Sequence, residues 1–242
     1  MAEQEIALIV GAGSGLSASL TRLFASEGAT VAVAARNIEK LAPICEETGA
    51  KAYSCDATDG AQVDQLFDAV GADLGVPDIV VYNASGRARG PITEVDREAV
   101  LNAVIVSCYA GFLVGQKAAQ LMLPRGSGSI FFTGASASIK GYPQSAPFAM
   151  GKFGLRGLAQ SMARELAPQN IHIGHFVIDG GIRQGPDDPR GARNLAAAGH
   201  TGEVTDSLLD PDAIARTYLD VHRQHRSAWT WEVELRPWVE KF

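Results

Sequence analysis

The stretch Val10-Gly11-Ala12-Gly13-Ser14-Gly15-Leu16 decides the fold of this chain. The apolar run Glu5–Val10 precedes it and predicts a strand, and Leu16–Ser26 follows it with leucines spaced along one helix face. Glycines at such a turn allow a tight bend and let the backbone approach a phosphate at the helix N-terminus. An ordinary flexible turn contains the same glycines, but the preceding strand and the following helix favour a nucleotide-binding unit.

The rest of the chain continues to alternate strands and helices. Further strands are expected at Thr30–Ala35, Lys51–Cys55, Asp78–Tyr82, Gly128–Thr133, Ile171–Ile178 and Trp229–Leu235. Further helices are expected at Leu41–Glu47, Val63–Val70, Arg97–Met122, Lys152–Leu166 and Pro211–His222. Apolar strands without polar alternation are buried on both faces, as a parallel sheet requires. Residues 1–242 are therefore expected to form a single α/β domain, a doubly wound Rossmann-type sheet of about seven parallel strands flanked by helices.

One segment departs from this pattern. Arg183–Gly202 is rich in Gly, Pro, Arg and Asp and is longer than an ordinary connection between elements. It predicts either a mobile loop that closes over the substrate or a disordered loop.

Composition and charge exclude several classes of function. The 242 residues are 46% hydrophobic and 20% charged, as in a soluble globular protein. Lys and Arg number 21 against 27 Asp and Glu, a net charge of −6, and no basic block occurs. Nucleic acid and membrane surfaces are therefore not expected as partners. The uncharged run inside Arg97–Met122 is interpreted as a buried helix rather than a membrane span.

The three cysteines and five histidines point away from a disulfide framework and from a metal site. Cys45, Cys55 and Cys108 are odd in number and widely spaced, and no histidine shares a metal-like spacing with a cysteine or carboxylate. The residues Met1–Glu5 lack the basic cluster of a signal peptide. We therefore expect no metal and a reducing, cytoplasmic location.

The end of the second strand indicates which dinucleotide the chain binds. An NAD site usually has an acid there to bind the ribose 2′-hydroxyl, but this strand ends Ala35-Arg36. An arginine at this position can clamp a 2′-phosphate and stack on adenine. Arg36 therefore favours NADP(H) over NAD(H), the alternative being a surface arginine at a strand end.

From about Glu5 to about Arg183 the chain resembles the short-chain dehydrogenase/reductase family. The family's opening T-G-x-x-x-G-[IL]-G falls on Val10, Gly11, Gly15, Leu16 and Ser17, so its Thr and last Gly are replaced. Its N-N-A-G falls on Tyr82-Asn83-Ala84-Ser85, and Asp56 matches its adenine-binding acid. The motifs and the resemblance together imply cofactor binding by Gly11, Ser14, Gly15, Leu16, Arg36, Asp56, Ala57, Asn83, Ala84, Ser85, Lys152, Gly180 and Ile182.

The catalytic positions of the family are not matched in the same way. The family uses a Tyr as general acid/base, a Lys four residues later, a Ser that positions the substrate oxygen, and an Asn that supports a relay water. Lys152 aligns with the Lys, whereas Phe148, Ala135 and Ser107 stand at the Tyr, Ser and Asn positions. Since Phe148 has no hydroxyl, Tyr142 is the best candidate for a displaced acid, although a pocket-lining aromatic is the simpler interpretation of it.

Three functions remain open. The first is an NADP(H)-dependent oxidoreductase that transfers hydride to or from a small organic substrate with non-standard proton delivery, in which Lys152 and Tyr142 are the candidate catalytic residues. The second is a catalytically inactive NADP(H)-binding protein that acts as a sensor or oligomer partner. The third is a non-redox catalyst that uses Lys152 as a nucleophile.

Self-association is also expected. The resemblance implies a homodimer or homotetramer, with Arg97–Met122 and the helix after Lys152 as the dimer-forming pair. The tail Trp229–Phe242 carries three tryptophans and is expected to pack on another subunit, on the loop Arg183–Gly202, or within its own subunit.

Overall fold

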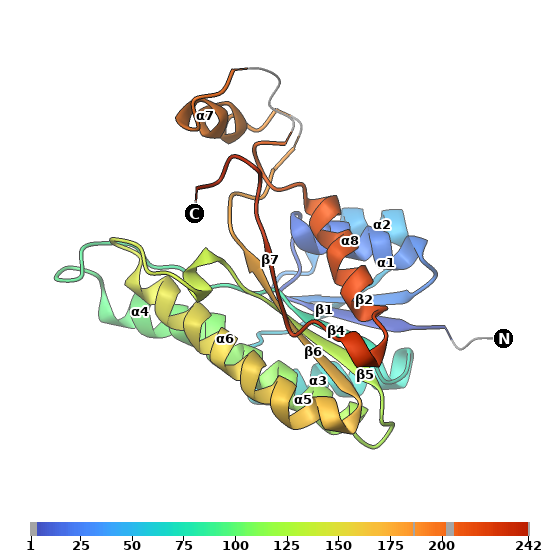
Figure 1. Ribbon diagram of the computed structural model, residues 1–242. Helices are drawn as coiled ribbons and strands as arrows, with labels where there is room; N and C mark the ends of the chain where they lie inside the picture. The colour runs from blue at the N-terminus through green and yellow to red at the C-terminus, as the bar shows by residue number, and fades with distance from the viewer. Residues whose placement is uncertain (1–3, 186, 202–205, 242) are drawn as a thin grey trace.

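The computed structural model describes residues 4–185, 187–201 and 206–241. Within them, a single seven-stranded parallel sheet runs through the molecule in the order β3-β2-β1-β4-β5-β6-β7 (Figure 1). The strands are β1 (Ile6–Val10), β2 (Thr30–Ala35), β3 (Lys51–Ser54), β4 (Ile79–Tyr82), β5 (Gly128–Thr133), β6 (Ile171–Ile178) and β7 (Glu232–Leu235). The expected fold class, a doubly wound parallel sheet of seven strands, is confirmed.

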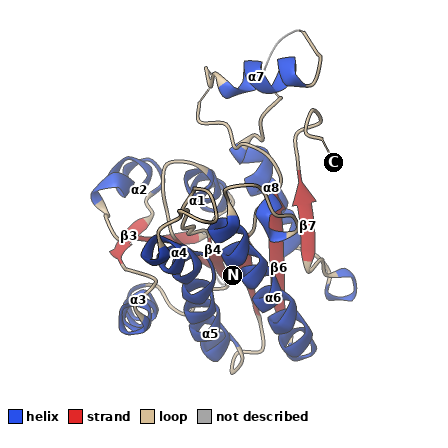
Figure 2. Ribbon diagram, turned by 90° about the vertical axis from the view of Figure 1, so that its left-hand side faces the viewer, coloured by secondary structure: helices blue, strands red, loops and turns tan. Residues whose placement is uncertain are grey.

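Helices cover both faces of the sheet. They are α1 (Leu16–Ser26), α2 (Ala42–Thr48), α3 (Gly60–Asp73), α4 (Arg97–Val104), α5 (Ala110–Met122), α6 (Ala146–Leu166), α7 (Arg190–Ala197) and α8 (Pro211–His222). Figure 2 shows α3, α5 and α6 on one face and α1, α2 and α8 on the other. Short 3-10 turns lie at Glu39–Leu41, Ser136–Ser138, Ala167–Gln169 and Arg226–Ala228.

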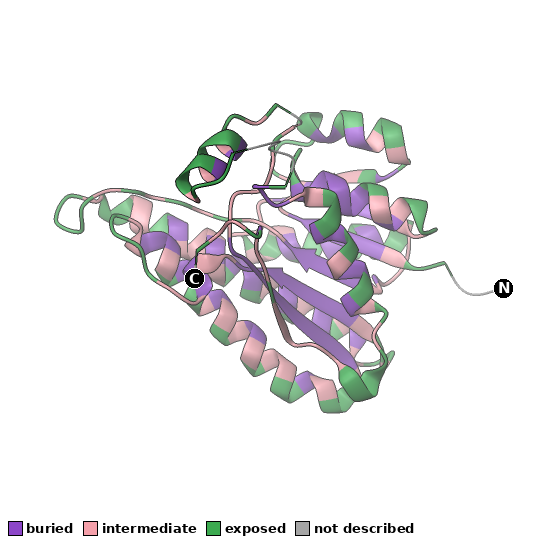
Figure 3. Ribbon diagram, turned by 45° about the horizontal axis from the view of Figure 1, so that its top comes forward, coloured by how far each residue is buried: buried purple, intermediate pink, exposed green. Residues whose placement is uncertain are grey.

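Each face of the sheet has its own hydrophobic core. Successive side chains of a strand point to opposite faces, so Leu8 and Val10 of β1 join the core under α3, α5 and α6. Ala7 and Ile9 join the core under α1, α2 and α8. All four are at most 1% exposed, and the strands are buried throughout the centre of the molecule (Figure 3).

The strand register brings the segments after β1, β2 and β4 together. Val10 lies opposite Ala34 of β2 and opposite Tyr82 of β4. The connection that follows β1 leads to β2 on one side, and the connection that follows β4 leads to β5 on the other side. The connections therefore diverge between β1 and β4, which is the position where open α/β sheets bind ligands.

The expected helix Arg97–Met122 is interrupted. A π-helical turn, Ile105–Tyr109, separates α4 from α5, and it contains the fully buried Ser107. By length and composition Arg97–Met122 is apolar enough to cross a membrane, yet α5 packs on the sheet core through residues such as Val114. Only a third of the most apolar 18 residues of Arg97–Met122 are buried, so the prediction of a buried helix is confirmed for one face of the helix only.

Two other predictions from the sequence need correction. Helix α6 begins at Ala146 rather than at Lys152, since Pro147 in its first turn has a backbone angle that suits a helix start. The expected loop Arg183–Gly202 contains a helix, α7, while residues 186 and 202 lie outside those that the structure describes. The Asp188 carboxylate accepts a bond from the Arg190 backbone N–H at 3.1 Å and so fixes the start of that helix.

The tryptophans of the C-terminal tail pack within the subunit. Trp229 stacks on His172 of β6 with ring centroids 4.5 Å apart. Trp238 is 57% exposed, and its ring meets the edge of His200 at 4.7 Å, in the segment that follows α7. Of the three packing partners that the sequence left open, the structure therefore supplies two, the subunit itself and the Arg183–Gly202 segment.

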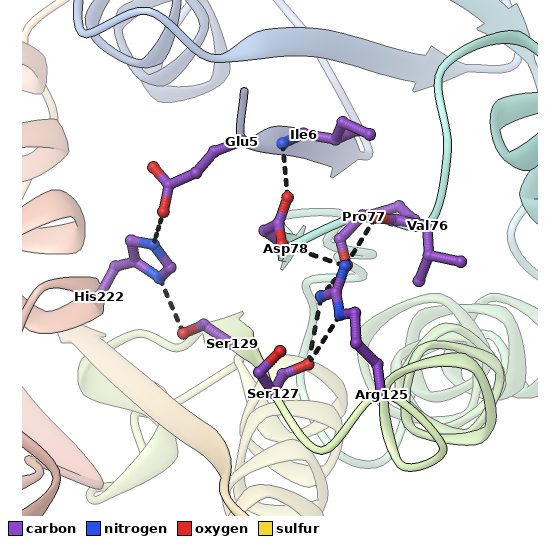
Figure 4. A network of polar contacts seen from close by, with 9 residues as sticks. All are labelled: Glu5, Ile6, Val76, Pro77, Asp78, Arg125, Ser127, Ser129 and His222. Carbon is purple, nitrogen blue, oxygen red and sulfur yellow. Dashed lines mark hydrogen bonds and ion pairs between the residues drawn. The ribbon is translucent and has the colours of Figure 1, made fainter. Parts of the chain in front are cut away.

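A polar network holds the sheet at the amino-terminal ends of its strands (Figure 4). The Asp78 carboxylate accepts a 2.8 Å hydrogen bond from the first backbone N–H of β1 and pairs with Arg125 at 3.0 Å. His222 bridges the Ser129 hydroxyl, at 2.8 Å, and the Glu5 carboxylate, at 2.9 Å. These contacts join β1, β4, β5 and α8 at the end of the sheet opposite the predicted site.

Candidate active site

Three adjoining cavities lie along the carboxyl ends of the strands. The Arg36 cavity, about 570 Å³, and the Lys152 cavity, about 510 Å³, share Gly11, Gly13, Asn83 and Ser85 in their walls. The Tyr142 cavity, about 350 Å³, shares Arg87 and Phe148 with the Lys152 cavity. The three cavities therefore form one continuous row.

The structure gathers every predicted cofactor-binding residue in this row. The Arg36 cavity is lined by Gly11, Ser14, Arg36, Asp56, Ala57, Asn83, Ala84 and Ser85. The Lys152 cavity adds Gly15, Leu16, Lys152, Gly180 and Ile182. Tyr142, the second predicted catalytic residue, lines the Tyr142 cavity with Phe148 instead.

The glycine-rich turn leaves space for a phosphate. Gly11 has φ +83°, and a Cβ there would lie 2.4 Å from the Ala84 backbone nitrogen, so this position needs glycine. A Cβ on Gly13 or Gly15 would meet nothing within 4 Å, so bare backbone lines the cavity there. The N-terminus of α1 has no side-chain cap, and its orphan N–H groups and dipole suit a pyrophosphate.

Ser17 ties the turn to the end of β4, a contact that sequence reasoning missed. The Asn83 side-chain amide donates a 2.7 Å hydrogen bond to Ser17 Oγ, which in turn donates to the Gly11 carbonyl at 3.4 Å. Ser17 stands where the family motif has its last glycine. The replacement therefore fixes the Asn83 side chain at the wall of the Lys152 cavity rather than opening the turn.

The outer end of the Arg36 cavity combines a fixed acid with exposed cations. Asp56 Oδ1 accepts hydrogen bonds from the Thr58 backbone at 3.0 Å and from the Thr58 hydroxyl at 2.8 Å. These bonds, with a smaller contribution from Arg36, hold the pKa of Asp56 below its usual range. Arg36 and Lys40 are exposed at the same wall, where an anionic group entering from solvent meets both.

Lys152 is a buried amine at the centre of the row. It is 2% exposed, and its Nζ donates a 2.7 Å hydrogen bond to the Thr133 carbonyl of β5. Burial, and to a lesser extent the charge of Arg87, lowers the pKa of Lys152 from 10.5 to about 7. An amine with that pKa both accepts and releases a proton near neutral pH.

The side chains around Lys152 offer little acid chemistry. Phe148 is 8% exposed and lines the same cavity as Ala135. Ser107 lies behind the wall, where its hydroxyl accepts from the Gly86 N–H at 2.9 Å and donates to the Gly86 carbonyl at 3.1 Å. Ser138 Oγ accepts from the Ala135 N–H at 3.1 Å and so serves as a turn residue.

The Tyr142 cavity is lined by a cation, Arg87, that the sequence analysis did not identify. The Arg87 guanidinium lies 4.4 Å above the Phe148 ring and lines both the Lys152 and the Tyr142 cavities. Tyr142 is 42% exposed, with its ring 6.0 Å from Lys140 Nζ. The sequence could have indicated Arg87 as a site residue through its position, because Arg87 closely follows Asn83 at the carboxyl end of a central strand.

Comparison with known proteins places this site in a family. The family model described as short chain dehydrogenase matches residues 5–182. The chain belongs to the short-chain dehydrogenase family. It is 31% identical to (+)-borneol dehydrogenase 1 of Salvia officinalis over 90% of this chain and 86% of that one. It is 32% identical to the 3-oxoacyl-[acyl-carrier-protein] reductase FabG of Thermotoga maritima over 71% of this chain and 72% of that one.

Solved structures support the same assignment. A short-chain dehydrogenase from Rhodopseudomonas palustris superposes with a TM-score of 0.81 at 35% identity, covering 98% of this chain and 100% of that one. An actinorhodin polyketide ketoreductase with NADPH superposes with a TM-score of 0.85 at 23% identity, covering 100% of each chain, and shows the fold alone. The relatives are dehydrogenases and reductases, which makes this chain a short-chain dehydrogenase-like oxidoreductase with a Rossmann nucleotide-binding fold.

Proposed function

We propose that this short-chain dehydrogenase is an NADP(H)-dependent oxidoreductase that acts on a small organic substrate with non-standard proton delivery. The observation that carries the proposal is the pairing of a buried Lys152 with Phe148 in one cavity. The amine is retained where the family holds its cofactor, while the ring beside it has no hydroxyl to donate.

The residues present fit the dinucleotide. The bare backbone at Gly13 and Gly15 suits the pyrophosphate, and Arg36, with Lys40, suits a 2′-phosphate. By resemblance, Asp56 binds the adenine and Lys152 the ribose beside the nicotinamide. When bound, the nicotinamide supplies or accepts the hydride, and the protein supplies position and electrostatics.

Lys152 is the proton source that the structure supports. With the dinucleotide bound, the Lys152 ammonium would release a proton to the oxygen of a carbonyl substrate during reduction, and the amine would take that proton back in the reverse reaction. A positioned acid contributes roughly 10²- to 10⁴-fold to the rate. Tyr142 lines a different cavity from Lys152, so it is the weaker candidate.

Substrates that need no strong acid suit this site best. An iminium already carries positive charge, and an enone or a quinone spreads the charge that forms on reduction. With Phe148 and Ala135 at the positions where the family donates to and orients the substrate oxygen, simple ketones are expected to react slowly. The same two residues support the second candidate, a non-catalytic NADP(H)-binding protein.

Titration with NADPH and NADH, followed by a substrate panel, separates the candidates. We expect tighter binding of NADPH and turnover of an iminium, an enone or a quinone but not of simple ketones. Binding without any turnover would support the non-catalytic protein. The Lys152→Ala variant should bind NADPH more weakly than the unaltered protein. If the unaltered protein binds neither NADPH nor NADH, the nucleotide-binding proposal fails.

We also propose that the chain forms a homodimer or homotetramer through α4, α5 and α6. These helices and the turn between α4 and α5 expose large apolar side chains, namely Leu101, Tyr109, Phe112, Met150 and Phe153. Sedimentation at micromolar concentration should show an oligomer that Phe153→Lys weakens. A monomer at all concentrations would refute the proposal.

A further inference from the structure

The charged side chains that line the Lys152 and Tyr142 cavities are all cationic among the described residues. Arg87, Lys152 and Arg190 line the first, and Arg87 and Arg89 line the second. Among the described residues, no Asp or Glu lines either cavity. Arg190 is paired with Asp188, whereas neither Arg87 nor Lys152 forms an ion pair with any described residue.

Arg87 is held where a substrate would enter. Its guanidinium stacks over the Phe148 ring at 4.4 Å, and its side chain stays exposed to the cavity. Partial burial, then the charge of Arg89, lowers the pKa of Arg87. The N–H groups of the guanidinium have no hydrogen-bond partner among the described residues, so they remain available as donors to a ligand.

We propose that the second substrate is a carboxylate, bound through its carboxyl group by Arg87 above Phe148. This inference deepens the proposed function and rests on it. A planar guanidinium matches a carboxylate with two parallel hydrogen bonds. Ser136 and Ser145 line the same cavity and supply hydroxyl groups within it.

The charge in the cavities favours a monoanion. Burial lowers the pKa of Lys152 to about 7, which weakens its positive charge at neutral pH, and Arg190 is already paired with Asp188. Arg87 lies at the boundary of the two cavities without an ion-pair partner among the described residues, so a single carboxylate there would balance its charge. A bound carboxylate also favours the ammonium form of Lys152, because it offsets the repulsion from Arg87. Substrate binding would thus load the proton that carbonyl reduction consumes.

The test measures binding rather than turnover. Benzoate and pyruvate are titrated into the protein saturated with NADP⁺, each against its neutral counterpart, benzamide and pyruvamide. We expect at least one acid to bind roughly 10- to 100-fold more tightly than its amide, the range for hydrogen bonds to a charged group. Arg87→Met should remove that preference. Arg97→Met is the matched control, and it should change acid affinity less than threefold because Arg97 is exposed and lines neither cavity.

NADPH affinity distinguishes the possible failures. Equal affinity for acid and amide, no binding of either acid, or a preference retained in Arg87→Met would each overturn the carboxylate proposal while leaving the dinucleotide proposal intact. A tenfold loss of NADPH affinity in Arg87→Met would also overturn it, because the arginine would then serve the cofactor. Failure of the unaltered protein to bind NADPH or NADP⁺ would instead refute the proposed function.

Discussion

Replacing Lys152 with methionine should stabilise the protein without its cofactor, and by an amount that depends on pH. Methionine fills a similar volume but carries no charge. In the folded protein the pKa of Lys152 is about 7, against 10.5 for an unperturbed lysine. The unfolded chain therefore binds more protons than the folded one between about pH 7 and 10.5, so the cost that the buried amine adds to folding falls as the pH rises through that window.

The magnitude follows from the two pKa values. At 1.36 kcal/mol per pH unit, the cost of burying Lys152 is about 4 kcal/mol at pH 7 and about 2 kcal/mol at pH 9. It is complete below pH 7 and disappears as the pH rises through 10.5. Lys152→Met also loses the hydrogen bond to the Thr133 carbonyl, about 1 kcal/mol, but this loss is the same at both pH values.

Urea denaturation of both proteins at pH 7 and pH 9 measures the effect. The stability difference between Lys152→Met and the unaltered protein should fall by about 2 kcal/mol from pH 7 to pH 9. Lys117→Met is the control, because Lys117 pairs with Asp64 and its pKa is raised, so its effect should be constant over this range. A constant difference for Lys152→Met would refute the argument that the amine is buried with a lowered pKa.

Three further predictions concern other parts of the molecule. Arg36→Ala should weaken NADPH binding roughly tenfold and leave NADH binding unchanged in fluorescence titrations, and equal losses for both would contradict the 2′-phosphate assignment. Ser107→Ala should cost about 1–3 kcal/mol of unfolding free energy, because the Gly86 N–H loses its partner, and an unchanged urea midpoint would contradict that role. Arg125→Met should cost about 1–3 kcal/mol through loss of its pair with Asp78, while the NADPH dissociation constant stays within twofold. A large change in NADPH affinity would show that the network reaches the site.

Sequence patterns were sufficient for the elements whose packing is simple. The bounds of α1, β2, β5 and α8 match the expected ranges because their apolar periodicity and end signals agree. The start of α6 was missed since its first turn, around Pro147, has no apolar repeat to mark it. The π turn around Ser107 was equally invisible, because Ile105–Tyr109 has the same apolar character as the helical residues on either side of it.

The site was predictable where a motif fixes the backbone and not where side chains meet across the fold. The residues after β1 and β4, such as Gly11 and Asn83, come together by strand register alone. The stacking of Arg87 on Phe148 joins a loop after β4 to α6, and no spacing in the sequence encodes that contact. The lowered pKa of Lys152 likewise depends on burial and on Arg87, which only the assembled fold reveals.

The network of Asp78, Arg125 and His222 has a consequence for how such a protein changes over time. It secures the strands at one end of the sheet, while the groups that meet the cofactor and substrate project from the other. Substitutions at the residues that line the cavities therefore leave the contacts that anchor the strands at the opposite end of the sheet in place. The two tasks are separated in space, so variation in the chemistry of the site does not touch the groups of this network.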